Sequence, residues 1–270
     1  MSTFQRTVIV TGASMGIGAA IAGQLERSGW RVFRTSRRPD PARDGPDTLA
    51  LDVTNDASVA AAVAEALARA GRIDAVVNNA GIAFVGAAEE TTADEALAVF
   101  QTNFFGVHRL CRAVLPAMRS QGQGRLVTIG SIAGFLPTPF LSFYSAAKHA
   151  IEGYVESLDY EVRPHGVRAL LIEPGFIRSN LGGNIQRASV SLDVYAAPRA
   201  SSEASQVRGI ARGTPSDAVA RAVETVLTRR RPRLRTRVGA DAHQLRLLRS
   251  VLPNALFGMG IRRQFGGGGS

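Results

Sequence analysis

Short apolar runs alternate with longer segments of helical periodicity along most of the chain. A run of about four to eight apolar residues bounded by glycine or proline is typical of a buried strand, whereas apolar residues that recur every three to four positions indicate a helix. The strands predicted in this way are 7–10, 31–35, 49–51, 75–77, 125–129, 167–172 and 234–238. The predicted helices are 17–28, 56–70, 93–118, 143–162 and 215–230, and Pro116 is expected to kink or end the third.

This alternation predicts a doubly wound parallel sheet of the Rossmann type, with about seven strands and helices on both faces. We expect one α/β domain over residues 1–265. The alternation fails between 179 and 213, and a long segment without periodicity is often a functional loop, so we expect a substrate-binding lid there. Residues 239–265 then form a C-terminal extension. The glycine-rich run 266–270 is expected to be a flexible tail or linker.

The composition restricts the class of protein further. With 45% hydrophobic and 20% charged residues, the 270-residue chain can bury a sizeable core. Its one cysteine, Cys111, excludes an intrachain disulfide and is expected to be a buried small hydrophobe. No signal peptide and no apolar stretch of about 18 residues are visible, which predicts a cytoplasmic protein without a transmembrane segment. The four histidines lack metal-ligand spacing, so no metal is expected.

The formal net charge of +10 is partly concentrated in a run of arginines. These are Arg229, Arg230, Arg231, Arg233, Arg235 and Arg237. The run is either a plain solvated edge or a site for an anionic partner, which includes an acyl carrier protein, a membrane surface or nucleic acid bound nonspecifically. No aromatic residues interleave with it, so no specific nucleic-acid partner is expected. The segment 252–265 either covers a subunit or touches a membrane.

A glycine-rich turn follows the first predicted strand and precedes the first predicted helix. It carries Gly12, Gly16 and Gly18. Glycine allows the backbone to approach a pyrophosphate, and the helix N-terminus supplies free N–H groups and the positive end of the helix dipole. The turn therefore predicts a dinucleotide site, although its spacing differs from the common G-x-G-x-x-G fingerprint.

Lys148 is the only lysine among 32 basic residues, and it follows Tyr144 by four positions. If both residues lie on one helix, this spacing puts their side chains on one face. A lysine ammonium is a compact charge with rotatable donors, whereas an arginine is a planar fork. Because all the remaining basic residues of the chain are arginines, this one lysine is expected to serve a specific purpose.

Together these motifs resemble the short-chain dehydrogenase/reductase family over nearly the whole chain up to residue 180. The landmarks are Gly12, Gly16, Gly18, Asn78, Asn79, Ala80, Gly81, Asn103, Ser131, Tyr144, Lys148, Pro174 and Gly175, with Ser179 where threonine is often found. The resemblance implies that Tyr144 is the general acid or base and that Ser131 holds the substrate carbonyl. It also implies that Lys148 binds the nicotinamide ribose and lowers the pKa of Tyr144, and that Asn103 anchors a water in a proton relay.

The residues at the end of the second strand determine which of the two nicotinamide cofactors is preferred. An acidic residue there binds the adenosine ribose of NAD, whereas an arginine accommodates the 2′-phosphate of NADP. Ser36 and Arg37 occupy these positions, so NADP(H) is expected to be preferred over NAD(H). The alternative is that Arg37 belongs only to a basic loop. By resemblance, the cofactor-binding residues are Gly12, Ser14, Met15, Gly16, Ile17, Gly18, Ser36, Arg37, Asp52, Val53, Asn79, Ala80, Gly81, Tyr144, Lys148, Pro174, Gly175 and Ile177.

The resemblance is strongest to carbonyl reductases and hydroxysteroid-dehydrogenase-like members. It implies hydride transfer between NADP(H) and a small hydrophobic ketone, aldehyde or secondary alcohol. Phe135, Phe140 and Phe143 either pack a loop or form an apolar wall beside the carbonyl. The alternatives are a 3-oxoacyl-[acyl-carrier-protein] reductase and a non-catalytic NADP(H)-sensing protein. Members of the family are usually homodimers or homotetramers, joined by the helices that correspond to 95–118 and 144–162.

Overall fold

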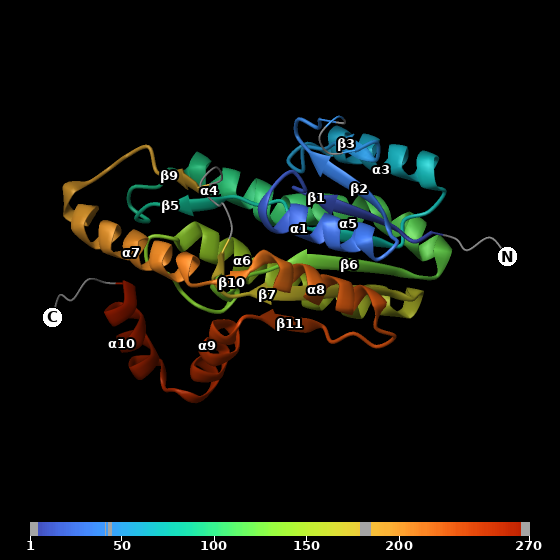
Figure 1. Ribbon diagram of the computed structural model, residues 1–270. Helices are drawn as coiled ribbons and strands as arrows, with labels where there is room; N and C mark the ends of the chain where they lie inside the picture. The colour runs from blue at the N-terminus through green and yellow to red at the C-terminus, as the bar shows by residue number, and fades with distance from the viewer. Residues whose placement is uncertain (1–4, 41, 43–44, 179–184, 266–270) are drawn as a thin grey trace.

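Seven parallel strands form one central sheet in the order β11-β7-β6-β4-β1-β2-β3 (Figure 1). The computed structural model describes residues 5–40, 42, 45–178 and 185–265. The strands are β1 (Thr7–Thr11), β2 (Arg31–Ser36), β3 (Thr48–Ala50), β4 (Ala75–Asn78), β6 (Gly124–Ile129), β7 (Val167–Pro174) and β11 (Arg235–Val238). The strand order reverses between β1 and β4, and ligands of doubly wound sheets bind beyond the carboxyl ends of the strands at such a point. The predicted Rossmann-type fold is confirmed.

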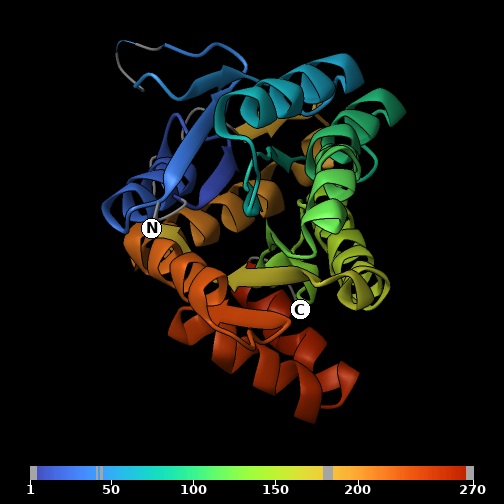
Figure 2. The same ribbon diagram turned by 90° about the vertical axis from the view of Figure 1, so that its right-hand side faces the viewer.

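Helices cover both faces of the sheet. One layer consists of α3 (Asp56–Ala70), α5 (Gly106–Gln121) and α6 (Ser142–Val162), and the other of α1 (Gly16–Arg27) and α8 (Ser216–Thr228). Figure 2 shows α1 and α8 on one side of the sheet and α5 and α6 on the other. Each layer encloses its own apolar core against the strands, and Cys111 is buried in the core under α5 as expected.

The helix predicted over 93–118 is two helices joined by a wider turn. It begins at α4 (Ala93–Phe100), passes through a π-helical turn, η1 (Gln101–Phe105), and continues as α5. Pro116 lies inside α5 and does not end it, so of the two expected effects the ending is not found, and the kink stays a prediction. Apolar periodicity indicates which face of a helix is buried, but it does not detect one extra residue in a turn. Turns of this π-helical kind are often found at functional sites.

The segment predicted to lack regular structure is largely helical in its described part. The strand β9 (Ile185–Arg187) pairs with β5 (Ala83–Val85), and α7 spans Asp193–Ala211. The buried positions of α7 are serines, Ser202 and Ser205, so the helix has no apolar stripe that periodicity could reveal. Residues 179–184, including Ser179, and the terminal run 266–270 lie outside the described residues.

The C-terminal extension is a pair of helices, α9 (Ala240–Val251) and α10 (Asn254–Phe265). Its inner face packs against the chain that follows β6, including the 3₁₀ turn η2 (Ile132–Gly134). The minor elements are β8 (Ile177–Arg178), which pairs with β10 (Thr214–Pro215), and the 3₁₀ turn η3 (Arg163–His165). Among the described residues, no helix combines the length and the apolar composition needed to cross a bilayer.

Candidate active site

A cavity of about 910 Å³ lies at the carboxyl ends of the central strands. Nearly all of the residues predicted from the sequence line it. They are Gly12, Ser14, Met15, Gly16, Ile17, Ser36, Arg37, Asp52, Val53, Asn79, Ala80, Gly81, Ser131, Tyr144, Lys148, Pro174, Gly175 and Ile177. Gly18 and Asn103 are the two predicted residues that do not reach the cavity wall.

The glycine turn points the N-terminus of α1 into the cavity. Gly12 and Gly16 have φ angles of 64° and 57°, in the left-handed region that favours glycine. The side-chain amide of Asn79 donates to the carbonyl oxygens of Thr11 (2.9 Å) and Gly12 (3.3 Å), which ties the end of β4 to this turn. Gly18 has a different purpose: a Cβ there would lie 2.1 Å from the Gly12 oxygen, so the residue allows α1 to pack closely on the turn.

Ser36, Arg37 and Asp52 line the opposite end of the cavity from Tyr144. The Oγ atom of Ser36 is buried and has no hydrogen-bond partner within the part of the chain that the structure describes. Arg37 is exposed. An oxygen of Asp52 accepts hydrogen bonds from the Thr54 amide (2.9 Å) and hydroxyl (2.7 Å), and these bonds lower the Asp52 pKa. This end therefore offers a buried hydroxyl that is unsatisfied within the described residues, and one exposed guanidinium, to a ligand.

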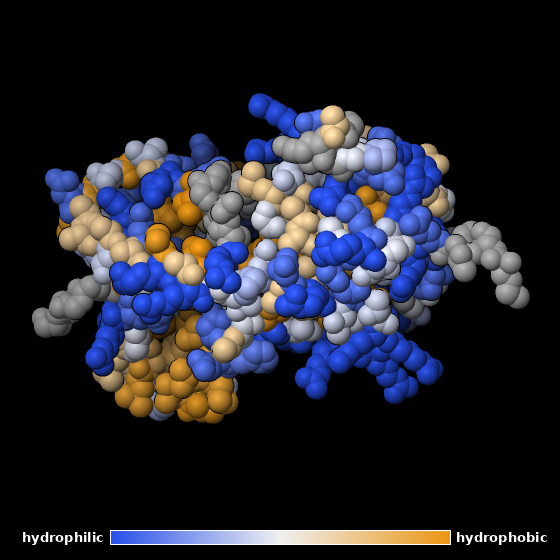
Figure 3. Space-filling view, in the orientation of Figure 1, coloured by the Kyte–Doolittle hydropathy of each residue, from blue (hydrophilic) through white to orange (hydrophobic). Residues whose placement is uncertain are grey.

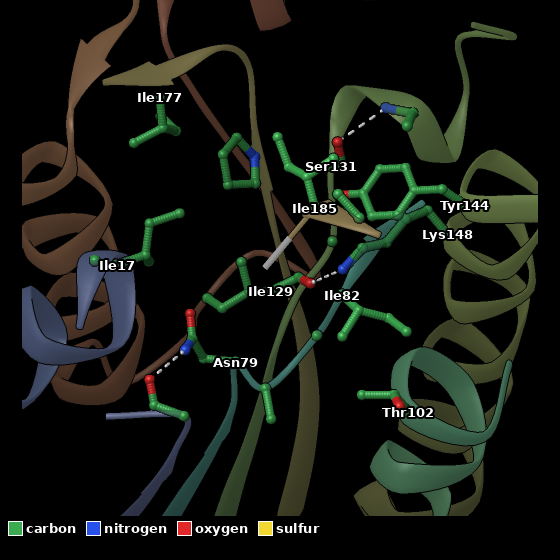
Figure 4. Close-up of a pocket in the computed structure, with 18 of the residues that line it drawn as sticks. Ile17, Asn79, Ile82, Thr102, Ile129, Ser131, Tyr144, Lys148, Ile177 and Ile185 are labelled. Carbon is green, nitrogen blue, oxygen red and sulfur yellow. Dashed lines mark hydrogen bonds between the residues drawn. The ribbon is translucent and has the colours of Figure 1, made fainter. Parts of the chain in front are cut away.

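Tyr144 and Ser131 face each other at the inner end of the cavity (Figure 4). Tyr144 lies in the first turn of α6, and Ser131 directly precedes η2. The Ser131 Oγ atom accepts a hydrogen bond from the Ala133 amide at 3.1 Å, which fixes the hydroxyl in place. Desolvation raises the pKa of the half-buried Tyr144, and a hydrogen bond with Ser131 opposes this rise.

Lys148 lies one helical turn after Tyr144, on the same face of α6. Its Nζ atom donates to the carbonyl oxygen of Ile129 at 2.8 Å and lies 5.8 Å from the centre of the Tyr144 ring (Figure 4). Burial lowers the pKa of Lys148 to about 8. The expected lowering of the Tyr144 pKa below its ordinary value is not found, because desolvation of the phenol outweighs its hydrogen bond.

Asn103 is buried in the π-helical turn, behind the cavity wall. Its side-chain oxygen accepts from the Ile82 amide (2.8 Å), and its side-chain nitrogen donates to the Ile82 carbonyl (2.9 Å). The side chain therefore holds Ile82, the residue just before β5, against the π-turn. The water relay implied by the family resemblance stays a prediction.

The rest of the cavity wall is mainly apolar and includes residues of the expected lid and of the stretch between Ser131 and Tyr144. These residues include Ile82, Val85, Leu136, Leu141, Phe176, Ile185, Gln206, Ile210 and Phe265. Of the apolar residues between Ser131 and Tyr144, Leu136 and Leu141 line the cavity, whereas Phe135 packs under the C-terminal helices. The described residues contain no cluster of histidine, cysteine and acidic side chains that could hold a metal.

Comparison with known proteins agrees with this arrangement of residues. A family model for short chain dehydrogenases matches residues 6–189, and the chain belongs to the short-chain dehydrogenase/reductase family of oxidoreductase enzymes. It is 41% identical over 177 residues to a 3-ketodihydrosphingosine reductase of Bacteroides thetaiotaomicron, covering 66% of this chain and 66% of that protein. The chain thus spans about two thirds of the length of this curated relative.

Two solved structures show the same likeness over a longer stretch. A short-chain dehydrogenase of Streptomyces avermitilis is 35% identical, with a TM-score of 0.84 and coverage of 96% of this chain and 98% of that one. A metagenomic short-chain oxidoreductase solved in complex with NADP is 28% identical, with a TM-score of 0.69 and coverage of 86% and 96%.

Proposed function

We propose that this protein transfers a hydride between NADP(H) and a hydrophobic ketone, aldehyde or secondary alcohol. The observation that carries the proposal is the pairing of the Tyr144 and Ser131 hydroxyls in a cavity with a mainly apolar wall, with the Lys148 ammonium beside them. This arrangement suits a substrate with one polar oxygen on an apolar body. Family membership establishes an oxidoreductase, and the roles of the individual residues are part of the proposal.

The residues present fit a nicotinamide dinucleotide. The α1 N-terminus and its glycine turn offer N–H groups to a pyrophosphate, and the Lys148 ammonium offers donors to a ribose. When bound, the cofactor supplies or accepts the hydride. These groups line the same cavity as Arg37 and Tyr144.

During reduction, the Tyr144 hydroxyl would donate its proton to the substrate oxygen while Ser131 donates a hydrogen bond to the same oxygen. A positioned donor of the second kind is worth about 10²–10³ in rate. Lys148 stabilises the tyrosinate that forms. Two unit charges about 6 Å apart at an effective dielectric near 20 attract by about 3 kcal/mol, which opposes the desolvation of the phenol. In alcohol oxidation the same groups act in reverse.

The preference for NADP(H) rests on Ser36 and Arg37. Asp52 is the only acidic residue among the described residues that line the cavity, and one of its oxygens already accepts two hydrogen bonds from Thr54. The Ser36 position therefore presents a hydroxyl to the cofactor, with a guanidinium next to it, and this pair suits a phosphate. The relative solved in complex with NADP supports the same choice.

Reduction of a ketone is favoured by the similarity to a 3-ketodihydrosphingosine reductase. A second candidate, a 3-oxoacyl-[acyl-carrier-protein] reductase, is favoured by a different observation. Arg229, Arg230 and Arg231 are exposed, and no ion pair is found for them within the described residues, so they could bind an acidic carrier. A homodimer or homotetramer through α5 and α6, and a cytoplasmic location, stay predictions.

A screen of NADPH oxidation across ketones, aldehydes and β-ketoacyl thioesters tests the proposal. We expect hydrophobic ketones to be turned over fastest. Much faster turnover of carrier-linked thioesters, lost on neutralising Arg229 to Arg231, would establish the second candidate instead. Tight NADPH binding without turnover of any carbonyl would contradict both candidates and favour the alternative of a non-catalytic NADP(H)-sensing protein.

A further inference from the structure

The outer face of the α9–α10 pair is apolar and has no partner in the described chain. Leu247, Val251, Leu256 and Met259 are 61%, 63%, 49% and 53% exposed. Figure 3 shows an apolar patch at the position where Figure 1 draws these two helices. The inner face is already occupied by contacts of Phe257, Ile261 and Phe265 with the core, so this second apolar face is not needed for folding.

Each of the two helices carries a pair of these side chains on one of its faces. Leu247 and Val251 are four residues apart on α9, and Leu256 and Met259 are three apart on α10, so each pair shares a face. Arg263 follows Met259 by four residues and continues the same stripe. The apolar surface therefore ends in exposed arginine side chains in the last turn of α10.

The charge around this surface is strongly one-sided. The extension contributes Arg246, Arg249, Arg262 and Arg263 but only one acidic residue, Asp241. An oxygen of Asp241 accepts from the Phe176 amide at 2.6 Å, so this carboxylate points toward the core. Arg246 and Arg249 lie over the rings of Phe135 and Phe257, and Arg249 also donates to Asn254 at 3.0 Å, whereas no ion pair to the exposed Arg262 and Arg263 is found in the parts of the chain described. A second copy of the chain would set arginines against arginines here, whereas an anionic surface complements them.

The loop that joins α8 to β11 adds further positive charge on the same side. It carries Arg229, Arg230, Arg231 and Arg233, all exposed. In Figure 1 this loop and the α9–α10 pair both lie along the lower edge of the molecule, at its right and its left, and Figure 3 shows hydrophilic side chains that project from the right part of that edge, apart from the apolar patch.

We propose that the α9–α10 pair docks on an anionic membrane surface. Its exposed leucine, valine and methionine side chains insert at the boundary of the acyl chains, and its arginines contact the headgroup phosphates. Phe265, on the inner face at the end of α10, lines the active-site cavity, so the docked helix also borders the site. If the proposed function holds, on which this step rests, a hydrophobic ketone dissolved in the bilayer then has a short route to Tyr144.

Sedimentation of the full chain with lipid vesicles tests the docking without any measurement of turnover. We expect binding to vesicles rich in phosphatidylglycerol, little binding to pure phosphatidylcholine, and loss of binding as salt is raised. Because each arginine near the surface strengthens binding about fivefold, Arg262→Gln with Arg263→Gln should weaken it about 25-fold. The triple variant Leu247→Ser, Val251→Ser and Met259→Ser should weaken it at least about tenfold.

The matched control replaces exposed valines outside the patch, Val194→Ser with Val207→Ser, which are 74% and 65% exposed on α7. It should bind as the wild type does. The proposal is overturned if the wild type does not bind anionic vesicles, or if the triple variant binds as well as the control. It is also overturned if the triple variant converts an oligomer to a monomer while vesicle binding is absent, since the patch would then be a subunit interface.

Vesicle binding and turnover separate this inference from the proposed function. All of these variants should reduce a water-soluble ketone at the wild-type rate, since none of the substituted side chains lines the cavity. Vesicle binding by a wild-type protein that reduces no ketone would leave the docking intact and refute the proposed function.

Discussion

Lys148 is buried in a position that suits an ammonium and leaves little space for a guanidinium. Its Nζ atom donates to the Ile129 carbonyl at 2.8 Å, and 8% of the residue is exposed. An ammonium can rotate its remaining donors toward a ribose and the Tyr144 oxygen, whereas the planar guanidinium presents five donors in a fixed fork. This local geometry accounts for one lysine in a chain that otherwise uses arginine.

Lys148→Arg tests that geometry while it keeps the charge. Since the fork is larger and cannot reproduce the bond to Ile129, we expect kcat/KM to fall at least about 100-fold, nearly as far as in Lys148→Ala. Steady-state kinetics measure the loss, and the circular dichroism of each variant checks that it is folded. An arginine variant close to wild-type activity would show that only the charge matters.

Cofactor choice is also a residue-scale property. Arg37→Ala removes the guanidinium at the edge of the cavity, and a charge-assisted bond of this kind contributes about 1.5–3 kcal/mol. We therefore expect kcat/KM for NADPH to fall about 10- to 100-fold while that for NADH changes little. Adding Ser36→Asp should reverse the preference, because the carboxylate repels a 2′-phosphate and binds a ribose. Equal effects on both cofactors would remove Arg37 from this role.

Spacing along the sequence predicts the residues that lie close together in the chain or directly after a strand, such as Tyr144 with Lys148 and Gly12 with Gly16. It could not predict Phe265, which reaches the cavity through the packing of α10 on the core, more than one hundred residues from Tyr144. It also could not predict the pKa of Tyr144, because desolvation depends on neighbours from other elements.

At the scale of elements, Gly18 determines how closely α1 packs on the glycine turn. A Cβ at this position would lie 2.1 Å from the Gly12 oxygen and 2.5 Å from the Asn79 amide. Gly18→Ala should therefore lower the free energy of unfolding by about 1–3 kcal/mol or more. The control is Gly23→Ala on the same helix, where the nearest atom is the end of Arg27 at 3.4 Å. It should raise the free energy of unfolding by about 0.5–1 kcal/mol, and a loss equal to that of Gly18→Ala would contradict the packing argument.

Glu90 attaches the segment around α7 to the rest of the domain. Its buried carboxylate pairs with Arg199 and accepts from the amides of Leu192 (2.8 Å) and Ala87 (2.9 Å). The bond to Arg199, followed by the two amides, lowers the pKa of Glu90 from 4.5 to about 2. The stabilisation of the folded state by the ionised Glu90 carboxylate is complete above pH 4.5 and is lost as the pH falls from 4.5 toward 2.

Glu90→Gln removes the negative charge of this carboxylate. At neutral pH it should therefore weaken the attachment in the same way as protonation of Glu90 does in the wild type at acid pH. We expect faster amide exchange in 188–199 and little change in the central strands. Glu65→Gln, at an exposed carboxylate on α3, serves as the control and should leave that exchange unchanged. Equal exchange in all three proteins would show that Glu90 does not hold the segment.

The elements that the sequence predicted are those with an apolar stripe or an apolar run. The central strands and α1, α3, α6 and α8 fall in this class because the sheet buries one face of each helix. The helix α7 buries serines, and the turn η1 adds a residue without changing which side chains are apolar, so neither leaves a mark in the pattern.

At the scale of the whole molecule, the sheet brings three distant segments to one edge. The glycine turn after β1, Ser131 after β6 and Lys148 on α6 meet there because parallel strands place their carboxyl ends together. The C-terminal pair α9–α10 covers the inner end of this cavity and carries the apolar, arginine-rich outer face. The active site and the proposed docking surface are thus two sides of one C-terminal element.

The central claim is that Tyr144 carries the proton in a hydride-transfer reaction, and the most direct test is the turnover of Tyr144→Phe. Removing the hydroxyl leaves the ring and the cavity in place, so NADPH should bind with nearly unchanged affinity while the reduction of a hydrophobic ketone falls at least about 10³-fold. NADPH oxidation and NADPH fluorescence measure the two quantities on the same sample. Turnover that persists in Tyr144→Phe would contradict the account.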